Sequence, residues 1–489
     1  MRPGTSSVFS EAVVRDLTEI VGPAQVHRGP AELLTYSFDG TFQQHVPDLA
    51  LTPGSEDEVV RIMRVAARER LAVIPRGAGT SLTGGTIPLA GGLVLSLTRL
   101  NRILEIDPVN SVAVVQPGVV TAHLQAAVEE MGLFYPPDPA SLQQSTLGGN
   151  VACNAGGPRC LKYGVTKDYV LGLHAVLADG RLLRCGGKLI KNVTGYQLAQ
   201  LFVGSEGTLG VITEITLRLV PRPRARATAV ALFDSLDAAS RAVTAVMAAG
   251  ILPVALEMID NTSLNLVEDF LRMGLPRRAE AMLLFEQDGA DQSGVSADLQ
   301  RIAEVCRSEG AREVQLATTA AEREALWKAR RSVSPALGRA RPNKLGEDIV
   351  VPRSAIPAMV RRIGEIGRRY DLPIPVFGHA GDGNLHPNIL FDRRRAGELA
   401  RVEAAAAGIF RAALELGGTL SGEHGIGTLK REFLQDDLGE TAVWAMERIK
   451  RALDPDGLLN PGKVFPQRGG EDHSGFLTAL PSLEGLTPG

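Results

Sequence analysis

The stretch RGAGTSLTGG, residues 76–85, follows directly on a buried strand expected at LAVIP, residues 71–75. Its four glycines permit positive φ angles and a close approach of a ligand to the backbone. Clustered backbone N–H groups, the hydroxyls of Thr80 and Ser81 and the charge of Arg76 make it a candidate site for a diphosphate. It does not match the dinucleotide fingerprint GxGxxG, because Leu82 stands at the third glycine. Glycine-rich turns between strands are common, so from this loop alone an ordinary turn and a phosphate-binding loop are equally good interpretations.

Two further glycine-rich segments shift that balance toward ligand binding. PPDPASLQQSTLGGNVACNAGGPRCLKYG, residues 136–164, is too long and too rich in glycine and asparagine for an ordinary connection. KNVTGYQLAQLFVGSEGTLGVITEITLRLVP, residues 191–221, runs from a turn through a helix expected at 196–202 to a glycine-rich turn and a strand. Paired glycines again let the backbone lie against a flat ligand. The N-terminal half is therefore expected to bind a phosphate-bearing cofactor.

Composition bounds the class of protein. A chain of 489 residues exceeds the size at which single cores stop growing, so we expect two domains or more. A net charge of −3 and an aromatic content of 4% argue against nucleic acid as a partner. Four cysteines without a CxxC pair indicate reduced thiols rather than a disulfide framework or a zinc knot.

We expect neither a signal peptide nor a membrane span. No apolar run approaches the 18 uncharged residues that a transmembrane helix needs. We expect a soluble, cytoplasmic protein, and a peripheral association with the inner face of a membrane stays open.

The Pro- and Arg-rich stretch VPRPRARA, residues 220–227, is a plausible domain boundary. Beyond it, strand and helix patterns alternate, which fits an α+β domain whose helices cover one face of an antiparallel sheet. A single long helix is expected at 320–337. The predicted domains are 1–222, 223–420, a C-terminal segment 421–466 that completes the active site, and a mobile tail at 467–489.

IPVFGHAGDGNLHPN, residues 374–388, places His379 and His386 around a glycine-rich bend. Seven residues apart, they would point to opposite faces of a continuous strand. The GDGN bend folds the strand back, so both imidazoles can face one ion. A pair of loop histidines is also common as plain structure, so the pair alone does not decide the matter.

SGEHGIG, residues 421–427, adds Glu423 and His424. Two imidazoles and a carboxylate suit a borderline divalent cation such as zinc, manganese or iron. A histidine beside that carboxylate can move a proton at neutral pH. A structural glycine-rich loop is the competing interpretation.

The three glycine-rich segments, in this order, resemble the FAD-binding domain of the vanillyl-alcohol oxidase and p-cresol methylhydroxylase (PCMH) flavoproteins. The resemblance implies that the first segment binds the FAD diphosphate and that the other two flank the isoalloxazine and the adenine-ribose. No histidine lies in the diphosphate loop, so we expect non-covalent FAD. The implied FAD contacts are Arg76, Gly77, Ala78, Gly79, Thr80, Ser81, Gly84, Gly85, Pro137, Asp138, Ser145, Gly148, Gly149, Asn150, Gly156, Gly164, Gly210, Ile212 and Asn460.

The C-terminal motifs FGHAGDGNLHPNILFD, GGTLSGEHGIG and DPDGLLNPGKVF resemble the FAD-linked 2-hydroxyacid dehydrogenases. That family includes the glycolate oxidase D subunit, D-lactate dehydrogenase and D-2-hydroxyglutarate dehydrogenase. The sequence around the metal motif is most similar to that of the glycolate oxidase D subunit. The resemblance spans roughly residues 35–466, and it implies a PCMH-type FAD domain with an α+β cap.

The resemblance also implies roles for single residues. His379, His386 and Glu423 hold a divalent metal, with zinc or manganese favoured, and His424 is the base that faces the flavin. Arg330 clamps the substrate carboxylate and Asn388 reaches the substrate.

Substrate size is the open question at this site. Arg331 is an alternative to Arg330, and Ser334 keeps a hydroxyl where the D-2-hydroxyglutarate enzymes have threonine. The family lysine aligns with Lys344 only across a one-residue gap. That departure favours a smaller acid.

We therefore predict oxidation of a small D-2-hydroxy acid, glycolate or D-lactate, with hydride transfer to flavin N5. D-2-hydroxyglutarate oxidation is the nearest alternative. A non-redox flavin transferase of the alkyl-glycerone-phosphate synthase type is disfavoured, because the histidines here are separated rather than in a run. A non-catalytic partner subunit would lack the metal and base motif. The electron acceptor stays open among oxygen, quinone and an iron–sulfur or second flavoprotein subunit, and so does a homo-oligomer.

Overall fold

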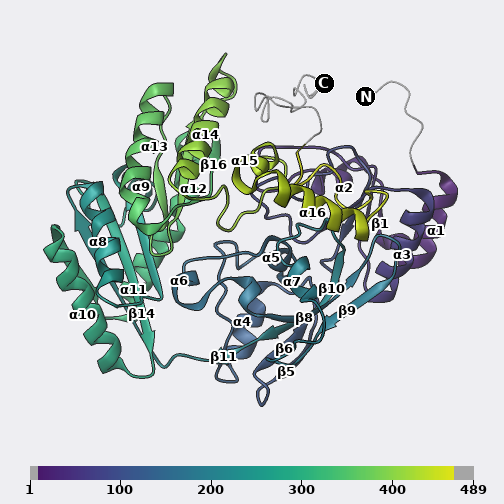
Figure 1. Ribbon diagram of the computed structural model, residues 1–489, viewed down its shortest axis with the longest axis horizontal. Helices are drawn as coiled ribbons and strands as arrows, with labels where there is room; N and C mark the ends of the chain where they lie inside the picture. Colours follow the sequence, from purple (N-terminus) through teal and green to yellow (C-terminus); the bar gives the residue numbers. More distant parts are fainter. Residues whose placement is uncertain (1–8, 467–489) are drawn as a thin grey trace. The chain divides into compact units, whose positions relative to one another are not determined.

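The computed structural model describes residues 9–466 and divides them into two compact units (Figure 1). Unit 1 contains residues 9–223 and 423–466, and unit 2 contains residues 224–422. The tail predicted at 467–489 lies outside the described residues.

Unit 1 begins with a four-stranded sheet of order β1-β2-β4-β3, in which β2, β4 and β3 run parallel. The elements are α1 (Glu11–Val21), β1 (Val26–His27), α2 (Pro30–Thr35), β2 (Leu49–Leu51), α3 (Glu56–Glu69), β3 (Val73–Arg76) and β4 (Leu93–Ser96). Apolar side chains of α1 and α3 pack on the buried strands in one core cluster. Ser55 starts α3, because its Oγ accepts the N–H of Glu58 at 3.2 Å.

A five-stranded antiparallel sheet of order β5-β6-β10-β8-β9 forms the second layer of unit 1. Its elements are β5 (Ile103–Asp107), β6 (Val112–Val115), α4 (Thr121–Glu129), α5 (Leu147–Cys153), α6 (Cys160–Tyr163), β8 (Val170–Val176), β9 (Leu182–Gly186), α7 (Leu198–Phe202) and β10 (Val211–Arg218). A short ladder joins β7 (Leu133–Phe134) to β11 (Val220–Pro221). Leu124 of α4, Leu147 of α5 and Phe202 of α7 share one core cluster with the sheet.

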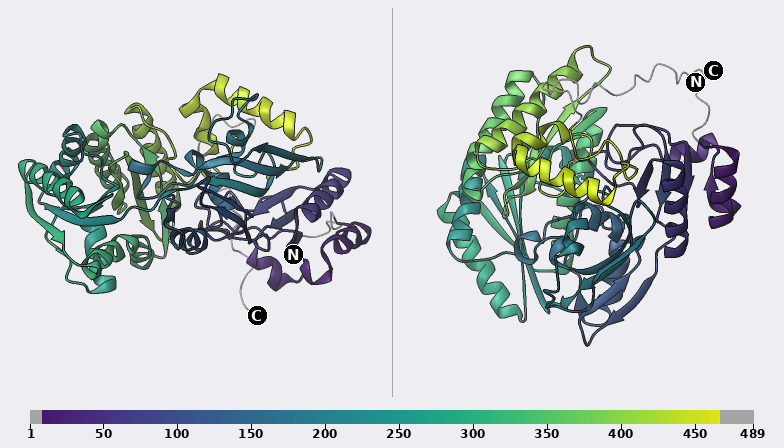
Figure 2. Two further views of the ribbon diagram at one scale, coloured as in Figure 1. Left: turned by 90° about the horizontal axis from the view of Figure 1, so that it is seen from below. Right: turned by 45° about the vertical axis from the view of Figure 1, so that its right-hand side comes forward.

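The C-terminal segment returns to unit 1 with α15 (Leu434–Leu438) and α16 (Glu440–Leu453). In both views of Figure 2 the yellow segment lies beside the teal strands of this unit. Leu459 bridges to Val73, and Lys450 Nζ donates to the carbonyl of Thr208 at 2.7 Å. Unit 1 is therefore built from two pieces of chain that are about 200 residues apart in sequence.

Unit 2 is an eight-stranded sheet with every paired neighbour antiparallel. The order is β15-β12-β14-β13-β18-β19-β16, with β17 also on β19. The strands are β12 (Ala225–Phe233), β13 (Ala255–Asp260), β14 (Ala281–Gly289), β15 (Ala311–Ala317), β16 (Asn343–Gly346), β17 (Ile349–Val350), β18 (Val376–His379) and β19 (Asn384–Phe391). The helices are α8 (Leu236–Ala248), α9 (Asn261–Leu271), α10 (Gln292–Ser308), α11 (Ala320–Arg331), α12 (Val333–Ala340), α13 (Ile356–Tyr370) and α14 (Glu398–Glu415).

Helices cover both faces of this sheet, so the expectation of one covered face is wrong. Neighbours in a strand point to opposite faces. Met258 contacts Ser240 of α8, whereas Ile259 packs in a cluster with Leu264 of α9 and Val333 of α12. Figure 1 shows α8 and α10 along one side of β14. Strand β12 is apolar at nearly every position, which is typical of a strand that is buried on both faces.

The single helix expected at 320–337 is also wrong, because α11 ends at Arg331 and α12 begins at Val333. Pro335 explains the break. In a continuous helix its ring would clash with the carbonyl of Arg331 and would leave that carbonyl without an N–H donor. In the first turn of α12 neither problem arises.

Strands β18 and β19 form the hairpin that carries the two histidines. The turn over 380–383 contains Gly383 at φ +89°, where a Cβ would lie 2.1 Å from the carbonyl oxygen of Val351. In the ladder, Phe377 pairs with His386 and His379 pairs with Asn384. Positions 377 and 379 share a face, so the bend brings both imidazoles to the same face of the sheet.

Candidate functional site

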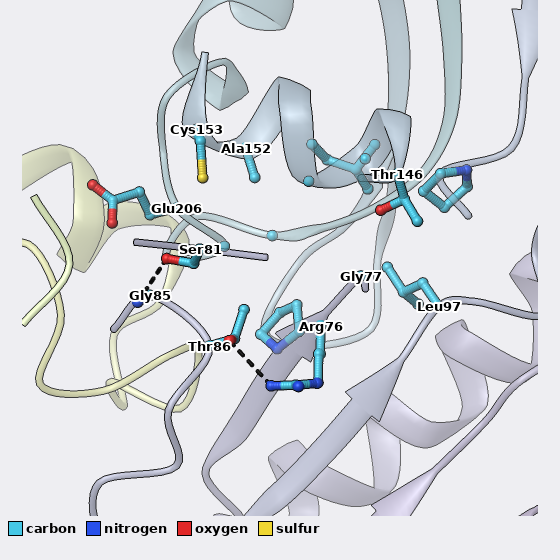
Figure 3. A pocket seen from close by; sticks show the side chains of 17 residues that line it. Arg76, Gly77, Ser81, Gly85, Thr86, Leu97, Thr146, Ala152, Cys153 and Glu206 are labelled. Atoms are coloured by element: carbon cyan, nitrogen blue, oxygen red, sulfur yellow. Dashed lines mark hydrogen bonds between the residues drawn. The ribbon is translucent and has the colours of Figure 1, made fainter. Parts of the chain in front are cut away.

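A cavity of about 610 Å³ lies within unit 1, where the three glycine-rich segments come together (Figure 3). Strand β3, the loop after it, helix α5 and the turn before β10 all contribute to its wall. Eight of the residues predicted to contact FAD line it: Arg76, Gly77, Ser81, Gly85, Gly148, Gly149, Gly210 and Ile212. A concave wall with a few converging polar groups is typical of small-molecule and cofactor sites.

Arg76 shapes the first loop as well as lining the cavity. Its Nη1 donates to Thr86 Oγ1 at 3.1 Å, and its Nη2 donates to the carbonyl of Phe38 at 2.7 Å. Burial lowers the pKa of this guanidinium, and the nearby Asp39 carboxylate partly opposes that shift. The side chain therefore holds the loop closed on itself while its charge stays at the cavity wall.

Thr146 is a polar group on the cavity wall that sequence reasoning missed. Its Oγ1 is buried, and no hydrogen-bond partner for it lies within the described part of the chain. A Cβ on Gly77 would lie 2.3 Å from this oxygen, so only glycine leaves it room. A buried hydroxyl without a partner is costly, and a ligand with acceptor oxygens would satisfy it. This observation fits a cofactor that carries phosphate.

Other predicted FAD contacts lie outside the cavity lining, and two of them, Ser145 and Asn150, stand directly beside lining residues in the sequence. Asn150 Nδ2 donates to Thr121 Oγ1 at 2.7 Å, and that hydroxyl lies 3.1 Å from Ser145 Oγ. Asp138 pairs with Arg159 at 3.2 Å. The remaining predicted contacts outside the lining are Ala78, Gly79, Thr80, Gly84, Pro137, Gly156, Gly164 and Asn460.

Glu206, also missed, joins the cavity to the returning C-terminal segment. Its two carboxylate oxygens accept the N–H groups of Ile426 at 2.7 Å and Gly427 at 2.8 Å. Asn460 Nδ2 donates to the carbonyls of Glu206 at 2.7 Å and Gly85 at 2.8 Å. Burial raises the pKa of Glu206, and the two backbone N–H groups counteract that effect. One carboxylate thus lines the cavity and holds the segment that carries His424.

His424 and Glu423 stand at the start of that segment, directly after the last residue of unit 2. Thr83 Oγ1 donates to the carbonyl of His424 at 3.2 Å, and His424 Nε2 lies 3.7 Å from Glu423 Oε1. A Cβ on Gly156 would lie 2.8 Å from Glu423 Oε2. Gly156, a predicted contact of FAD, therefore makes room for the Glu423 carboxylate in this structure.

In unit 2 the two histidines meet face to edge, with ring centroids 5.2 Å apart. Both are buried, and the ring of His386 also lies 5.4 Å from that of Phe377. Asn388, expected near the substrate, is buried, and its Nδ2 donates to the carbonyl of His386 at 2.7 Å.

Arg330 and His379 share one partner, Glu257 of β13. Arg330 Nε donates to Glu257 Oε2 at 2.6 Å, and His379 Nδ1 lies 2.7 Å from Oε1. The guanidinium also lies over the ring of Phe377, 4.8 Å from its centroid. Burial alone would raise the pKa of Glu257, but the charges of Arg330 and His379 outweigh it and lower that pKa.

Asp348, another residue that sequence reasoning missed, anchors the end of unit 2. Its carboxylate accepts from Asn384 Nδ2 at 2.6 Å, Ser421 Oγ at 2.7 Å and the N–H of Gly422 at 2.9 Å. The same carboxylate lies 3.8 Å from His386 Nδ1. One buried acid therefore holds the start of β19 and the residue before Glu423.

Lys344 is tied to the hydroxyl of Ser334. Its Nζ donates to Ser334 Oγ at 2.5 Å, and burial lowers the pKa of the ammonium group. Arg331, the alternative to Arg330, instead pairs with Glu324 at the exposed surface of α11. The structure thus places Arg330, not Arg331, beside the histidines.

The fold and the motifs define a class, the FAD-linked oxidases. A family model described as "FAD linked oxidases, C-terminal domain" matches residues 222–464, and one described as "FAD binding domain" matches residues 47–186. The chain belongs to this family, and it is an FAD-linked oxidoreductase. The family resemblance, the α+β class and FAD as cofactor are confirmed.

Among named relatives, the chain is 48% identical to the glycolate oxidase subunit GlcD of Bacillus subtilis, over 94% of this chain and 97% of that protein. It is 41% identical to the subunit of the same name from Escherichia coli K12, over 93% and 91%. It is 37% identical to a D-lactate dehydrogenase of Archaeoglobus fulgidus, over 88% and 95%.

Solved structures share the fold at low identity. Substrate-bound p-cresol methylhydroxylase matches with a TM-score of 0.78 and 17% identity, over 96% of this chain and 99% of that chain. An alkyldihydroxyacetonephosphate synthase matches with a TM-score of 0.73 and 19% identity, over 94% and 87%. In the part of the chain that the structure describes, no helix has the length and apolar character needed to cross a membrane.

Replacing Thr146 tests the cavity. Thr146→Val removes the partnerless hydroxyl, so we expect FAD to bind about 5-fold more weakly, the equivalent of about 1 kcal/mol for one hydrogen bond. The FAD-free protein should be at least as stable as wild type, because a buried unsatisfied group is gone. Titration with FAD and thermal unfolding without it measure both effects. In the control, Thr121→Val removes a hydroxyl that already has hydrogen-bond partners and should destabilise the FAD-free protein. Unchanged FAD affinity in Thr146→Val would contradict the assignment of this cavity to FAD.

Replacing Glu206 tests the connection to the C-terminal segment. Glu206→Gln can accept only one of the two N–H groups, and losing a hydrogen bond to a charged group costs about 2 kcal/mol. We expect FAD to be released at a lower temperature, measured by flavin fluorescence during heating. Glu214→Gln on β10 is the control, because that side chain is part-exposed and lies 3.5 Å from His174. Equal release temperatures for both variants would show that the Glu206 contacts do not hold the segment.

Proposed function

We propose that this protein oxidises a small D-2-hydroxy acid, glycolate or D-lactate, to the 2-oxo acid with FAD as the oxidant. The observation that carries the proposal is the buried pair of imidazoles beside an arginine, all three on elements of unit 2. An anchored cation and a guanidinium are the groups that would bind the hydroxyl and the carboxylate of such an acid. The similarity to proteins named as glycolate oxidase subunits and D-lactate dehydrogenases supports the substrate class.

The cavity of unit 1 fits FAD by its glycine-rich wall and by the partnerless hydroxyl of Thr146. When bound, FAD supplies an isoalloxazine whose N5 accepts two electrons and a hydrogen as hydride. We propose that the FAD is held without a covalent bond. The reaction requires that the flavin in unit 1 meets an acid held by residues of unit 2.

We propose that His379, His386 and Glu423 hold a divalent cation, zinc or manganese, as two nitrogens and one oxygen suit such ions. Chain connectivity supports Glu423, since it follows Gly422, whose N–H is fixed by the same Asp348 that lies near His386. When bound, the cation lowers the pKa of the substrate hydroxyl that it coordinates.

Three side chains then act on the substrate. His424 takes the proton of the C2 hydroxyl on a ring nitrogen as the C2 hydrogen leaves with its electron pair, so the acid loses two electrons and two hydrogens in total. The Nε–Nη2 edge of Arg330 is engaged by Glu257, and we assign its other edge to the substrate carboxylate. Asn388 orients the substrate.

Oxidation of D-2-hydroxyglutarate is the second candidate. Lys344 and Ser334 are hydrogen-bonded to each other in unit 2, and together they offer donors for the second carboxylate of that acid. A transferase is not favoured, since the likeness to the alkyldihydroxyacetonephosphate synthase is one of fold alone. We propose that electrons leave the flavin to an iron–sulfur or second flavoprotein subunit, because relatives at 41–48% identity are named as subunits.

The direct test is anaerobic mixing of the FAD-loaded protein with glycolate, D-lactate or D-2-hydroxyglutarate. Loss of flavin absorbance near its long-wavelength maximum reports reduction. We expect rapid bleaching by glycolate or D-lactate and slow bleaching by D-2-hydroxyglutarate. A flavin that no 2-hydroxy acid bleaches would refute the function.

Removing the base should abolish reduction without removing the cofactor. In His424→Ala we expect FAD to stay bound and the reduction rate to fall by a factor of about 10² to 10⁴, the usual contribution of general base catalysis. His123→Ala, an exposed histidine on α4, is the control and should behave as wild type. Normal reduction in His424→Ala would remove the role of this residue.

Metal removal should show whether the cation is needed for the reaction or for folding. After treatment with a chelator we expect the protein to stay folded and to keep FAD, while the reduction rate falls and recovers on adding Zn²⁺ or Mn²⁺. His386→Ala should be slow before chelation and insensitive to it. Full activity in wild-type protein that has been shown by metal analysis to hold no cation would reject the metal site.

A further inference from the structure

We infer that Glu257 is a positioning residue that sets the metal-binding nitrogen of His379 and the substrate-facing edge of Arg330 at the same time. This inference rests on the proposed function, and it assigns a role to a residue that neither the motifs nor the resemblance singled out. Glu257 lies on β13, with no exposed surface, and both of its carboxylate oxygens are used.

The ladder between β13 and β18 explains how one acid reaches both groups. Met258 pairs with Gly378, so Glu257 lies across from His379 on the neighbouring strand. Glu257 also shares a face with Ile259, which is the face that packs against α9 and α12. Helix α11 lies on the same side and delivers Arg330 to the second oxygen.

The contact with His379 determines which ring nitrogen can bind a metal. An ionised carboxylate only accepts hydrogen bonds, so the 2.7 Å contact with Oε1 requires the hydrogen on Nδ1. In a neutral imidazole the lone pair is then on Nε2, which becomes the ligand atom. A carboxylate in this position also makes the imidazole a stronger base and fixes the plane of its ring.

The contact with Arg330 determines which edge of the guanidinium remains for substrate. Nε and Nη2 both lie 2.6 Å from Glu257 Oε2, while the ring of Phe377 covers one face of the guanidinium. The group is thereby held by its edge and by its face, which leaves the Nη1 side to meet a carboxylate. Cation affinity and substrate affinity should consequently depend on one buried acid.

A glutamine cannot replace this acid. Its amide has one acceptor oxygen and one donor nitrogen, so in Glu257→Gln it can accept from His379 or from Arg330 but not from both. The same substitution at Glu286 is the matched control. Glu286 is buried on the adjacent strand β14 and accepts from Trp327 Nε1 at 2.7 Å.

The test measures cation affinity directly, on FAD-loaded protein titrated with Mn²⁺ or Zn²⁺ against a chelator of known affinity. We expect Glu257→Gln to bind the cation 10- to 100-fold more weakly, the usual loss when a carboxylate that orients a metal-binding histidine is removed. With saturating cation, its KM for the 2-hydroxy acid should also rise. Glu286→Gln should keep wild-type cation affinity and KM, even if its thermal stability falls.

Two results would overturn the inference: wild-type cation affinity in Glu257→Gln, or an equal loss of affinity in Glu286→Gln. If Glu257→Gln does not fold, Glu257→Asp serves instead, since its side chain is too short to reach both partners, and wild-type affinity there would also contradict the role. If wild type itself bound no cation and no acid bleached its flavin, the proposed function would fail first and the inference with it. If wild type is active and metal-bound while Glu257→Gln matches it, only the inference fails.

Discussion

Unit 1 depends on the hydrogen bonds between a buried carboxylate, Glu206, and the C-terminal segment that returns to this unit at residue 423. The chain leaves this unit at residue 223 and re-enters at residue 423, so the unit is complete only when both pieces meet. Bringing together two pieces that are about 200 residues apart lowers the entropy of the chain, and contacts between the pieces must compensate for that loss. The acceptors and donors that compensate are buried and specific: Glu206 with Ile426 and Gly427, and Asn460 with Gly85. The residues that line the cavity of unit 1 and those that hold the segment with His424 are therefore partly the same.

Unit 2 uses buried charge in a similar way. A buried ion pair contributes little net stability, because desolvation offsets most of the Coulomb attraction, but breaking one leaves an uncompensated charge. The ion pair of Glu257 with Arg330 is thus better explained by placement than by stability, and the hydrogen bonds of Asp348 to Asn384 and Gly422 likewise hold two distant segments in place. Glu257 fixes two proposed functional groups, and Asp348 fixes the residue that precedes Glu423 in the chain.

Much of this arrangement could be predicted from local sequence. The glycine-rich segments gave the cavity wall at Ser81, Gly148 and Ile212, because glycine marks backbone that must bend or lie close to another group. The GDGN bend gave the common face of His379 and His386, because strand alternation and a tight turn together determine which side chains meet. Motifs of this kind carry their geometry within a few residues.

The residues that were missed act across long separations. Glu257 meets partners 73 and 122 positions away, and Glu206 meets partners more than 200 positions away. An acid inside the apolar run VALEMID is a signal of a buried partner, but it does not name that partner. The second covered face of the unit 2 sheet was readable from the second half of β12, where residues 229–233 (AVALF) form a continuous apolar run.

The central claim is that an isoalloxazine held by unit 1 receives hydride from an acid held by unit 2. A crystal structure of the protein with FAD, Mn²⁺ and an unreactive 2-hydroxy acid analogue tests it most directly. We predict an anomalous manganese peak bound by the imidazoles of His379 and His386 and the carboxylate of Glu423, with C2 of the analogue about 3 to 3.5 Å from flavin N5. A flavin bound elsewhere, or imidazoles that point away from both the metal and the acid, would contradict the account.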